Sequence, residues 1–271
     1  MGLSKALRRK QISRIERGAE GGLTDDVLAV EEPLEIRVGG RSIAVVMRTP
    51  GRDRELVAGF LVTEGLLKRR DDVLDMVRCD NREREGGENV IDVLLAPGAT
   101  VDLQRLTRHV FTSSSCGICS KATIEAVRAE FPPITAPFSP SQEVLASLPD
   151  KLRAAQTGFA ASGGLHASGL FDASGTLEIV AEDVGRHNAL DKVIGQAFFA
   201  EQLPLVGRIL LVSGRVSFEL MQKALAAGIP CVAAISAPTT AAVELAWESG
   251  QTLVGFLRDG RMNVYAGTLA G

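Results

Sequence analysis

The sequence is poor in several residue types, and each scarcity narrows what the protein can be. Its 271 residues include only three histidines, four cysteines and one tryptophan. No uninterrupted apolar run approaches the ~18 residues of a membrane-spanning helix. The basic segment at residues 5–10 is not followed by the apolar core of a secretion signal. These features predict a protein of the cytoplasm that does not enter a membrane.

An excess of charge of either sign is also lacking. There are 30 Lys and Arg against 33 Asp and Glu, which gives a formal net charge of -3 at neutral pH. Proteins that bind nucleic acid polymers usually carry a marked positive charge. We therefore expect no broad nucleic-acid binding, although a local basic patch is compatible with this average. With 45% hydrophobic residues, the composition is that of an ordinary globular protein.

Two of the four cysteines lie close together. Cys116 and Cys119 stand in the small, polar run TSSSCGICSK at residues 112–121. This composition predicts an accessible loop, and Lys121 together with the start of a helix at 121–126 favours the thiolate form. Such a pair serves as half of a zinc site, as a dithiol and disulfide couple, or as a thiol carrier with a second cysteine nearby.

The remaining candidates for metal ligands do not complete a zinc site. A structural zinc usually has four nitrogen or sulfur ligands, but Cys79 and Cys231 are far apart in the sequence and unpaired. Cys231 opens the apolar run 231–235, where a buried structural role is expected. His166 is not part of the His-x-Glu motif of zinc deaminases. No resident metal is therefore predicted.

The first half of the chain predicts an α+β region. Residues 1–22 are polar and basic without periodicity, so a flexible arm is expected there. A region at 23–110 follows, in which alternating residues around Gly39-Gly40 predict a hairpin and apolar spacing predicts a helix. The expected elements are a hairpin at 34–38 and 41–47, a helix at 53–64, and strands at 71–78 and 89–95.

The second half, at 111–271, carries the cysteine pair and predicts an α/β domain. A proline-rich connector at 132–137 precedes a helix that begins near Ser141. Short apolar strands then alternate with helices, which is typical of parallel crossovers. The expected elements are a hairpin at 163–171 and 176–181, helices at 188–199, 218–227 and 241–248, strands at 209–212 and 231–235, and a final hairpin at 252–257 and 262–265.

Ligands of open α/β sheets bind beyond the carboxyl ends of the strands. Ser213, Gly214 and Arg215 follow one expected strand, and residues 236–240 follow the next. The glycine permits close approach of an anion, and the arginine offers a planar fork for phosphate. The stretch 182–188, EDVGRHN, either transfers protons and orients a ligand or forms a helix entry capped by His187 or Asn188.

Several motifs, in one order, resemble those of the FdhD/NarQ family of formate dehydrogenase accessory sulfurtransferases. The resemblance runs from about the first hairpin to the C-terminus. One departure is Ser120, where family members commonly carry glycine. The motifs are CGIC at 116–119, GGLH at 163–166, EDVGRHNALDK at 182–192, VSGR at 212–215 and SAPT at 236–239.

The resemblance implies a sulfur carrier. Cys116 would accept persulfide sulfur from a cysteine desulfurase, with Cys119 as the assisting thiol. The sulfur would pass to the molybdenum cofactor, a bis(molybdopterin guanine dinucleotide), that is destined for formate dehydrogenase. The resemblance also implies a homodimer and a three-layer α/β/α sandwich in the second half, similar to cytidine deaminases but without their zinc.

The family's cofactor-binding stretch corresponds to the final turn of this chain. Two arginines beside an aromatic ring can hold phosphate and stack a base. Two alternatives remain open at this point: a zinc-dependent, deaminase-like hydrolase and a non-catalytic nucleotide-binding module. The candidate cofactor-binding residues are Phe256, Leu257, Arg258, Asp259, Gly260 and Arg261, with Ser213, Gly214 and Arg215 as a second wall.

Overall fold

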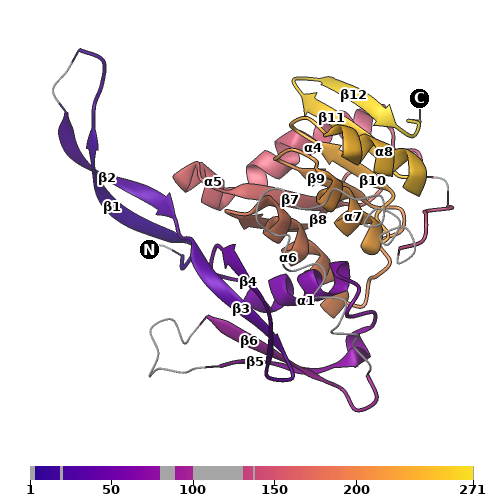
Figure 1. The fold of residues 1–271 in the computed structure, drawn as a ribbon. Helices are drawn as coiled ribbons and strands as arrows, with labels where there is room; N and C mark the ends of the chain where they lie inside the picture. The colour runs from indigo at the N-terminus through magenta and orange to yellow at the C-terminus, as the bar shows by residue number, and fades with distance from the viewer. Residues whose placement is uncertain (1–3, 19–20, 80–88, 100–130, 137, 271) are drawn as a thin grey trace.

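The structure, a computed structural model, describes residues 4–18, 21–79, 89–99, 131–136 and 138–270. It has three parts: a projecting two-stranded ribbon, a four-stranded sheet, and a six-stranded sheet with helices on both faces (Figure 1). The mixed α/β class expected from the sequence is confirmed. The expected boundary between the two halves, at residue 110, lies outside the described residues.

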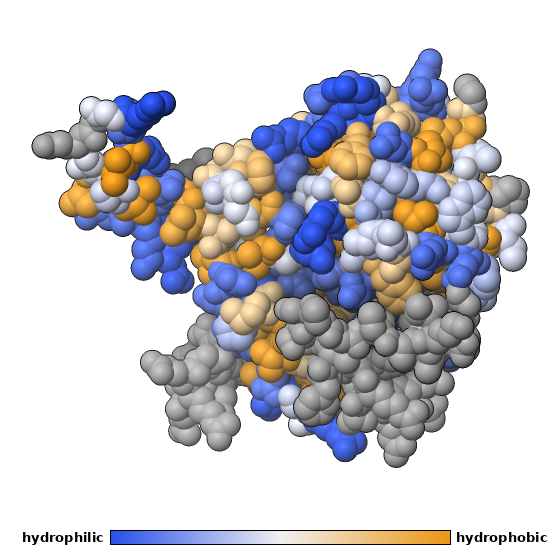
Figure 2. Space-filling view, turned by 45° about the horizontal axis from the view of Figure 1, so that its top comes forward, coloured by the Kyte–Doolittle hydropathy of each residue, from blue (hydrophilic) through white to orange (hydrophobic). Residues whose placement is uncertain are grey.

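The ribbon replaces the flexible arm that the sequence predicts at residues 1–22. Strand β1 (Leu7–Arg14) pairs antiparallel with β2 (Gly22–Ala29) along its whole length. The ribbon stands out from the body of the molecule, with polar and apolar residues side by side (Figure 2). No residue of either strand is buried, and Leu23 is 74% exposed. Because no face is buried, the sequence lacks the alternation by which a strand is usually detected.

The four-stranded sheet has the order β4-β3-β6-β5 and is covered by helix α1. The expected hairpin turns at Gly39 and Gly40, both at positive φ. A short 3-10 turn at Arg70–Asp72 leads into the last two strands. The hairpin, helix and strands expected in this region are therefore present. Their bounds are β3 Glu32–Val38, β4 Arg41–Arg48, α1 Asp53–Thr63, β5 Val73–Arg78 and β6 Val90–Leu95.

The six-stranded sheet has the order β12-β11-β10-β9-β7-β8. Strands β9, β10 and β11 are parallel, as expected from the alternation with helices, and β7 and β12 run against their neighbours. The strands are β7 His166–Phe171, β8 Leu177–Asp183, β9 Ile209–Val212, β10 Cys231–Ala234, β11 Thr252–Arg258 and β12 Arg261–Ala266.

Helices cover both faces of this sheet and so form three layers. Leu145, Leu148 and Leu152 of α4 pack on one face. The other face is covered by α6, α7 and α8 (Figure 1). A likeness to cytidine deaminases stays a prediction. The helix bounds are α4 Gln142–Ala155, α5 Thr157–Ser162, α6 Arg186–Phe199, α7 Phe218–Ala226 and α8 Thr240–Ser249.

Helices α1 and α6 join the two sheets through an unusually close crossing. Gly59 of α1 lies against the backbone of Asp191, and Gly195 of α6 lies against the backbone of Glu55. One continuous core includes residues of α1, α6 and both sheets. The four-stranded sheet is thus fixed to the larger one, although the two come from different halves of the chain.

Candidate functional site

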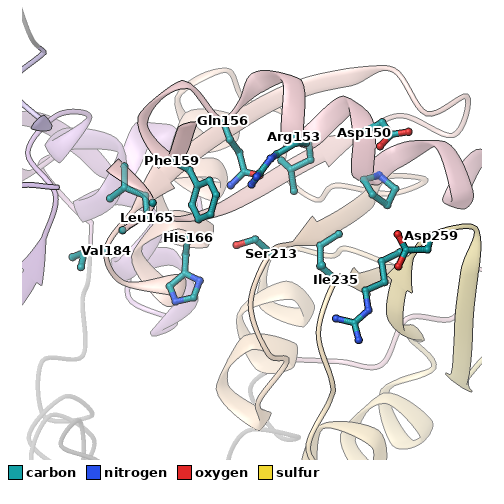
Figure 3. A pocket seen from close by; sticks show the side chains of 15 residues that line it. Asp150, Arg153, Gln156, Phe159, Leu165, His166, Val184, Ser213, Ile235 and Asp259 are labelled. Carbon is teal, nitrogen blue, oxygen red and sulfur yellow. The ribbon is translucent and has the colours of Figure 1, made fainter. Parts of the chain in front are cut away.

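A pocket of about 720 Å³ opens at one edge of the six-stranded sheet (Figure 3). Its lining includes Ser213, Ile235 and Arg258, which lie where β9, β10 and β11 end. His166 begins β7, which runs in the opposite direction, so it reaches the same edge. This is the position expected for ligands of α/β sheets, and the volume is in the range of ligand pockets.

The pocket brings together three of the site residues expected from the sequence: Ser213, Arg258 and Asp259. The hydroxyl of Ser213 accepts a hydrogen bond of 2.9 Å from the N–H of Ala167, and its own proton remains available for a ligand. Arg258 is exposed and supplies a guanidinium with five donors. Two segments that are distant in the sequence therefore meet at one pocket.

The final hairpin gives Arg258 and Asp259 their positions. Asp259 and Gly260 have φ of 53° and 70°, which is the backbone of a tight hairpin turn between Arg258 and Arg261. Phe256 lies at a bulge with φ of 52°, and its N–H donates to Ser236. A phenylalanine at positive φ is uncommon, and such strain is frequent at ligand sites.

Several other expected site residues lie outside the lining of this pocket. The side chain of Leu257 is buried in the core beneath α4, so only its backbone is open to a ligand. Arg215 and Arg261 are exposed. Residues 236–240 follow the pocket wall, but Thr239 caps helix α8 by accepting from the N–H of Ala242. The structure thus separates the expected arginines into one at the pocket and two on open surface.

The opposite wall of the pocket was not anticipated from the sequence. It comes from α4 and the short helix α5, which contribute Arg153 and Phe159. The guanidinium of Arg153 lies 4.6 Å from the centroid of the Phe159 ring. Figure 3 shows this pair above His166. An arginine six residues before a phenylalanine is not a recognisable motif, and α5 is too short to give a periodic signal.

The stretch 182–188 proves to be largely structural. Asp183 is buried and forms a 2.6 Å ion pair with Lys192. The same carboxylate accepts from the N–H groups of Thr49 and Gly185. Glu182 accepts from two N–H groups at the start of α5. These contacts hold the end of β4, the pocket wall and α6 together, and they leave no carboxylate of this stretch free for proton transfer.

His187 packs where α6 and α7 begin. Its Nε2 lies 3.3 Å from the hydroxyl of Ser217 and 3.8 Å from the carboxylate of Glu219. Burial and then the positive charges of Lys223, Arg186 and His166 lower the pKa of His187 to about 4, against the opposing effect of Glu219. The imidazole is therefore neutral at neutral pH.

This lowered pKa predicts a loss of stability in mild acid. The unfolded chain takes up the proton near pH 6.5, whereas the folded chain does so only near pH 4, so acid favours unfolding between these values. From pH 7 to pH 5 we expect His187 to reduce the free energy of unfolding by about 1 to 2 kcal/mol. Urea unfolding of the unmodified protein and of His187→Gln measures this; equal losses in both proteins would exclude His187 as the source.

The structure describes two of the four cysteines, Cys79 and Cys231. Burial raises the pKa of the Cys231 thiol to about 12, so this residue is a structural one. Cys79 is half-buried and not in a disulfide. Cys116 and Cys119 lie outside the described residues.

Within the described ranges, no three His, Cys, Asp or Glu side chains are grouped so as to hold a metal ion. No described helix is long and apolar enough to cross a membrane.

The fold and the pocket together define an α/β protein that offers guanidinium and hydroxyl groups to a ligand at the carboxyl edge of a mixed sheet. The chain belongs to the FdhD/NarQ family, whose model matches residues 29–269. The family resemblance seen in the motifs is thus confirmed over most of the chain.

Similar proteins span nearly the same length. A sulfur carrier protein FdhD of Streptomyces avermitilis is 51% identical and is aligned over 98% of this chain and 95% of its own. The protein of the same description from Mycobacterium tuberculosis is 52% identical over 89% and 90%. The fold is similar to that of a proposed formate dehydrogenase accessory protein from Desulfotalea psychrophila, with a TM-score of 0.76, 24% identity and 97% of each chain covered.

Proposed function

We propose that this protein is a sulfur carrier that serves formate dehydrogenase. It accepts persulfide sulfur from a cysteine desulfurase and transfers it to the molybdenum cofactor. The observation that carries this proposal is the family match over residues 29–269, which includes the cysteine pair. Relatives at about half identity bear the description of sulfur carriers. The proposed setting is the cytoplasm, and the proposed assembly is a homodimer.

The cysteine pair can carry out both halves of the transfer. In the first, the Cys116 thiolate attacks the outer sulfur of the desulfurase persulfide; a new S–S bond forms on Cys116 and the desulfurase leaves as its thiolate. In the second, the Cys119 thiolate attacks the Cys116 sulfur. The outer sulfur then leaves as sulfide, and its two electrons come from the pair, which becomes a disulfide. The sulfide is taken up by the molybdenum of the substrate.

The pocket is the proposed site for the guanine nucleotide part of that substrate. Arg258 and Ser213 supply donors for phosphate oxygens, and Phe159 with Arg153 supplies a flat surface for a base. The protein is slightly acidic overall, so local arginines must provide the attraction for the dinucleotide phosphates. Of the residues expected at the final turn, Arg258 is the one proposed to contact the nucleotide phosphates directly.

This assignment predicts that Arg258 contributes to nucleotide binding and that Arg261 does not. A charge-assisted hydrogen bond to phosphate contributes ~1.5 to 3 kcal/mol, so Arg258→Ala should weaken GDP binding by about ten- to a hundredfold. Arg261→Ala is the matched control, because Arg261 pairs opposite Arg258 in the hairpin but does not line the pocket. Calorimetric titration with GDP compares them. Equal affinities for Arg258→Ala and the unmodified protein would remove this turn from the site.

A further inference from the structure

The projecting ribbon of β1 and β2 carries an uneven distribution of charge. Strand β1 has four basic residues and no acidic one, whereas β2 has two acidic residues and no basic one. The protein as a whole has slightly more acidic than basic residues, so the positive charge of β1 is a local feature. The residues are Arg8, Arg9, Lys10 and Arg14 on β1, and Asp25 and Asp26 on β2.

Three of the four cations lie on one face of the ribbon. Successive side chains of a strand point to opposite faces, so Arg8, Lys10 and Arg14 share a face. On this face Asp26 of β2 stands opposite Lys10 and lies 3.9 Å from Arg14. Arg8 lies 3.8 Å from Glu32. Long, exposed ion pairs contribute little free energy, so the three cations retain most of their attraction for a further anionic group.

The outer edge of β1 can accept another strand. In the part of the chain that the structure describes, β1 pairs with β2 alone. Every second residue of such a strand directs its N–H and C=O groups away from its neighbour, which makes the edge a template for a further strand. No residue of β1 is buried, and the ribbon stands out from the body of the molecule (Figure 1). An extended segment of another protein can therefore lie along this edge.

The charges decide which kind of segment fits. A two-fold symmetric contact between two copies of the chain would pair each edge strand with itself. For β1 this places cations opposite cations, and for β2 it places the two central carboxylates opposite their own copies. Like charges opposite each other destabilise a strand pair. The ribbon edge is thus unsuited to a second copy of itself and suited to a strand of opposite charge.

The base of the ribbon lies beside the pocket. Helix α5, which forms part of the pocket wall, packs next to β2. A Cβ atom placed on Gly164, which lines the pocket, would be 3.4 Å from Cβ of Ala29 at the end of β2. A protein bound along the ribbon is therefore held next to the pocket.

We propose that β1 is a docking strand for a partner protein, which adds an extended acidic segment to the free edge of the ribbon. Main-chain hydrogen bonds hold the added strand, and carboxylates at alternate positions, on the face of Arg8, Lys10 and Arg14, select it. The position suits a protein that exchanges a ligand with the pocket. That use rests on the proposed function, whereas the strand pairing does not.

Short peptides test the pairing on the full-length protein. Three labelled eight-residue peptides, in which threonine alternates with glutamate, serine or lysine, are titrated by fluorescence anisotropy. We expect the glutamate peptide to bind best and its affinity to fall as salt is added. The triple variant Arg8→Gln, Lys10→Gln, Arg14→Gln should bind it about tenfold less tightly or weaker. Lys10→Gln alone, which removes neither ion pair of this face, should weaken binding by about two- to fivefold.

A matched control makes the same change of net charge elsewhere. The triple variant Arg41→Gln, Arg54→Gln, Arg69→Gln removes three exposed arginines of the four-stranded sheet and its connections, and it should bind the glutamate peptide as the unmodified protein does. No residue of β1 is buried, so the melting temperature of the ribbon variants should be unchanged. Hydrogen exchange of the free variants checks that the ribbon persists.

Hydrogen exchange also separates strand pairing from attraction between side chains. The glutamate peptide should slow the exchange of amides in β1, because its carbonyl groups accept from the outward N–H groups. Binding without this protection would overturn the docking strand, and so would equal affinity for the unmodified protein and the Lys10→Gln variant. If sedimentation showed a dimer that only the ribbon variants lose, the occupant would be a second copy and the proposal would be wrong. None of these measurements depends on Cys116 or on nucleotide binding.

Discussion

Cys116→Ala is expected to abolish sulfur transfer. Without its thiolate the protein has no acceptor for the persulfide sulfur, and the alanine methyl group cannot replace it. Formate dehydrogenase produced in cells with this variant should have the activity found in cells that lack the protein. In vitro, incubation with a cysteine desulfurase and cysteine should add the mass of one sulfur atom to the unmodified protein and none to Cys116→Ala.

Two other cysteine variants make this experiment selective. Cys79→Ala is the matched control, since Cys79 is a free, half-buried cysteine outside the pair, and it should retain full transfer. Cys119→Ala should still be loaded with sulfur but should release it slowly, because the assisting thiol is lost. Normal formate dehydrogenase activity with Cys116→Ala would overturn the assignment of the carrier, whatever the outcome for Cys119.

The extent to which the sequence predicts this fold depends on how each element is buried. Helix α1 was found from the spacing of its apolar residues, and strands β9 and β10 were found from short uninterrupted apolar runs that are buried throughout. The ribbon β1–β2 was missed for the opposite reason, since none of its residues is buried. Helix α5 was missed because six residues, five of them with small side chains, do not define an apolar face. A local sequence pattern therefore predicts an element that has a buried apolar face, and it does not predict one that lacks such a face.

The candidate site follows the same pattern. Ser213 was predicted because it follows a recognisable strand, whose end lies at an edge of the sheet, and Arg258 was predicted because the family resemblance marks the final turn. Arg153 and Phe159 reach the pocket only through the packing of α4 on that sheet, which no local motif records. From the sequence, His166 was considered as a member of a zinc motif that is absent, and the strand order places it at the same edge. Tertiary packing, rather than residue type, decides these positions.

The close crossing of α1 and α6 gives the second large expected effect. In isolation, glycine to alanine within a helix stabilises the helix by about 1 kcal/mol. At Gly195, however, the added methyl group would overlap the carbonyl group of Glu55 in α1, and backbone atoms cannot move aside as a side chain can. The helices would have to separate and open the core that joins the two sheets.

We therefore expect Gly195→Ala to reduce the free energy of unfolding by at least ~3 kcal/mol, and Gly59→Ala, which meets the backbone of Asp191, to do the same. Gly22→Ala is the matched control, since a Cβ atom there meets nothing within 4 Å, and its effect should stay within about 0.5 kcal/mol. Denaturant unfolding of the three variants measures these differences. If Gly195→Ala proved as stable as Gly22→Ala, the helices would not cross at this distance. The four-stranded sheet would then need another means of attachment to the larger sheet.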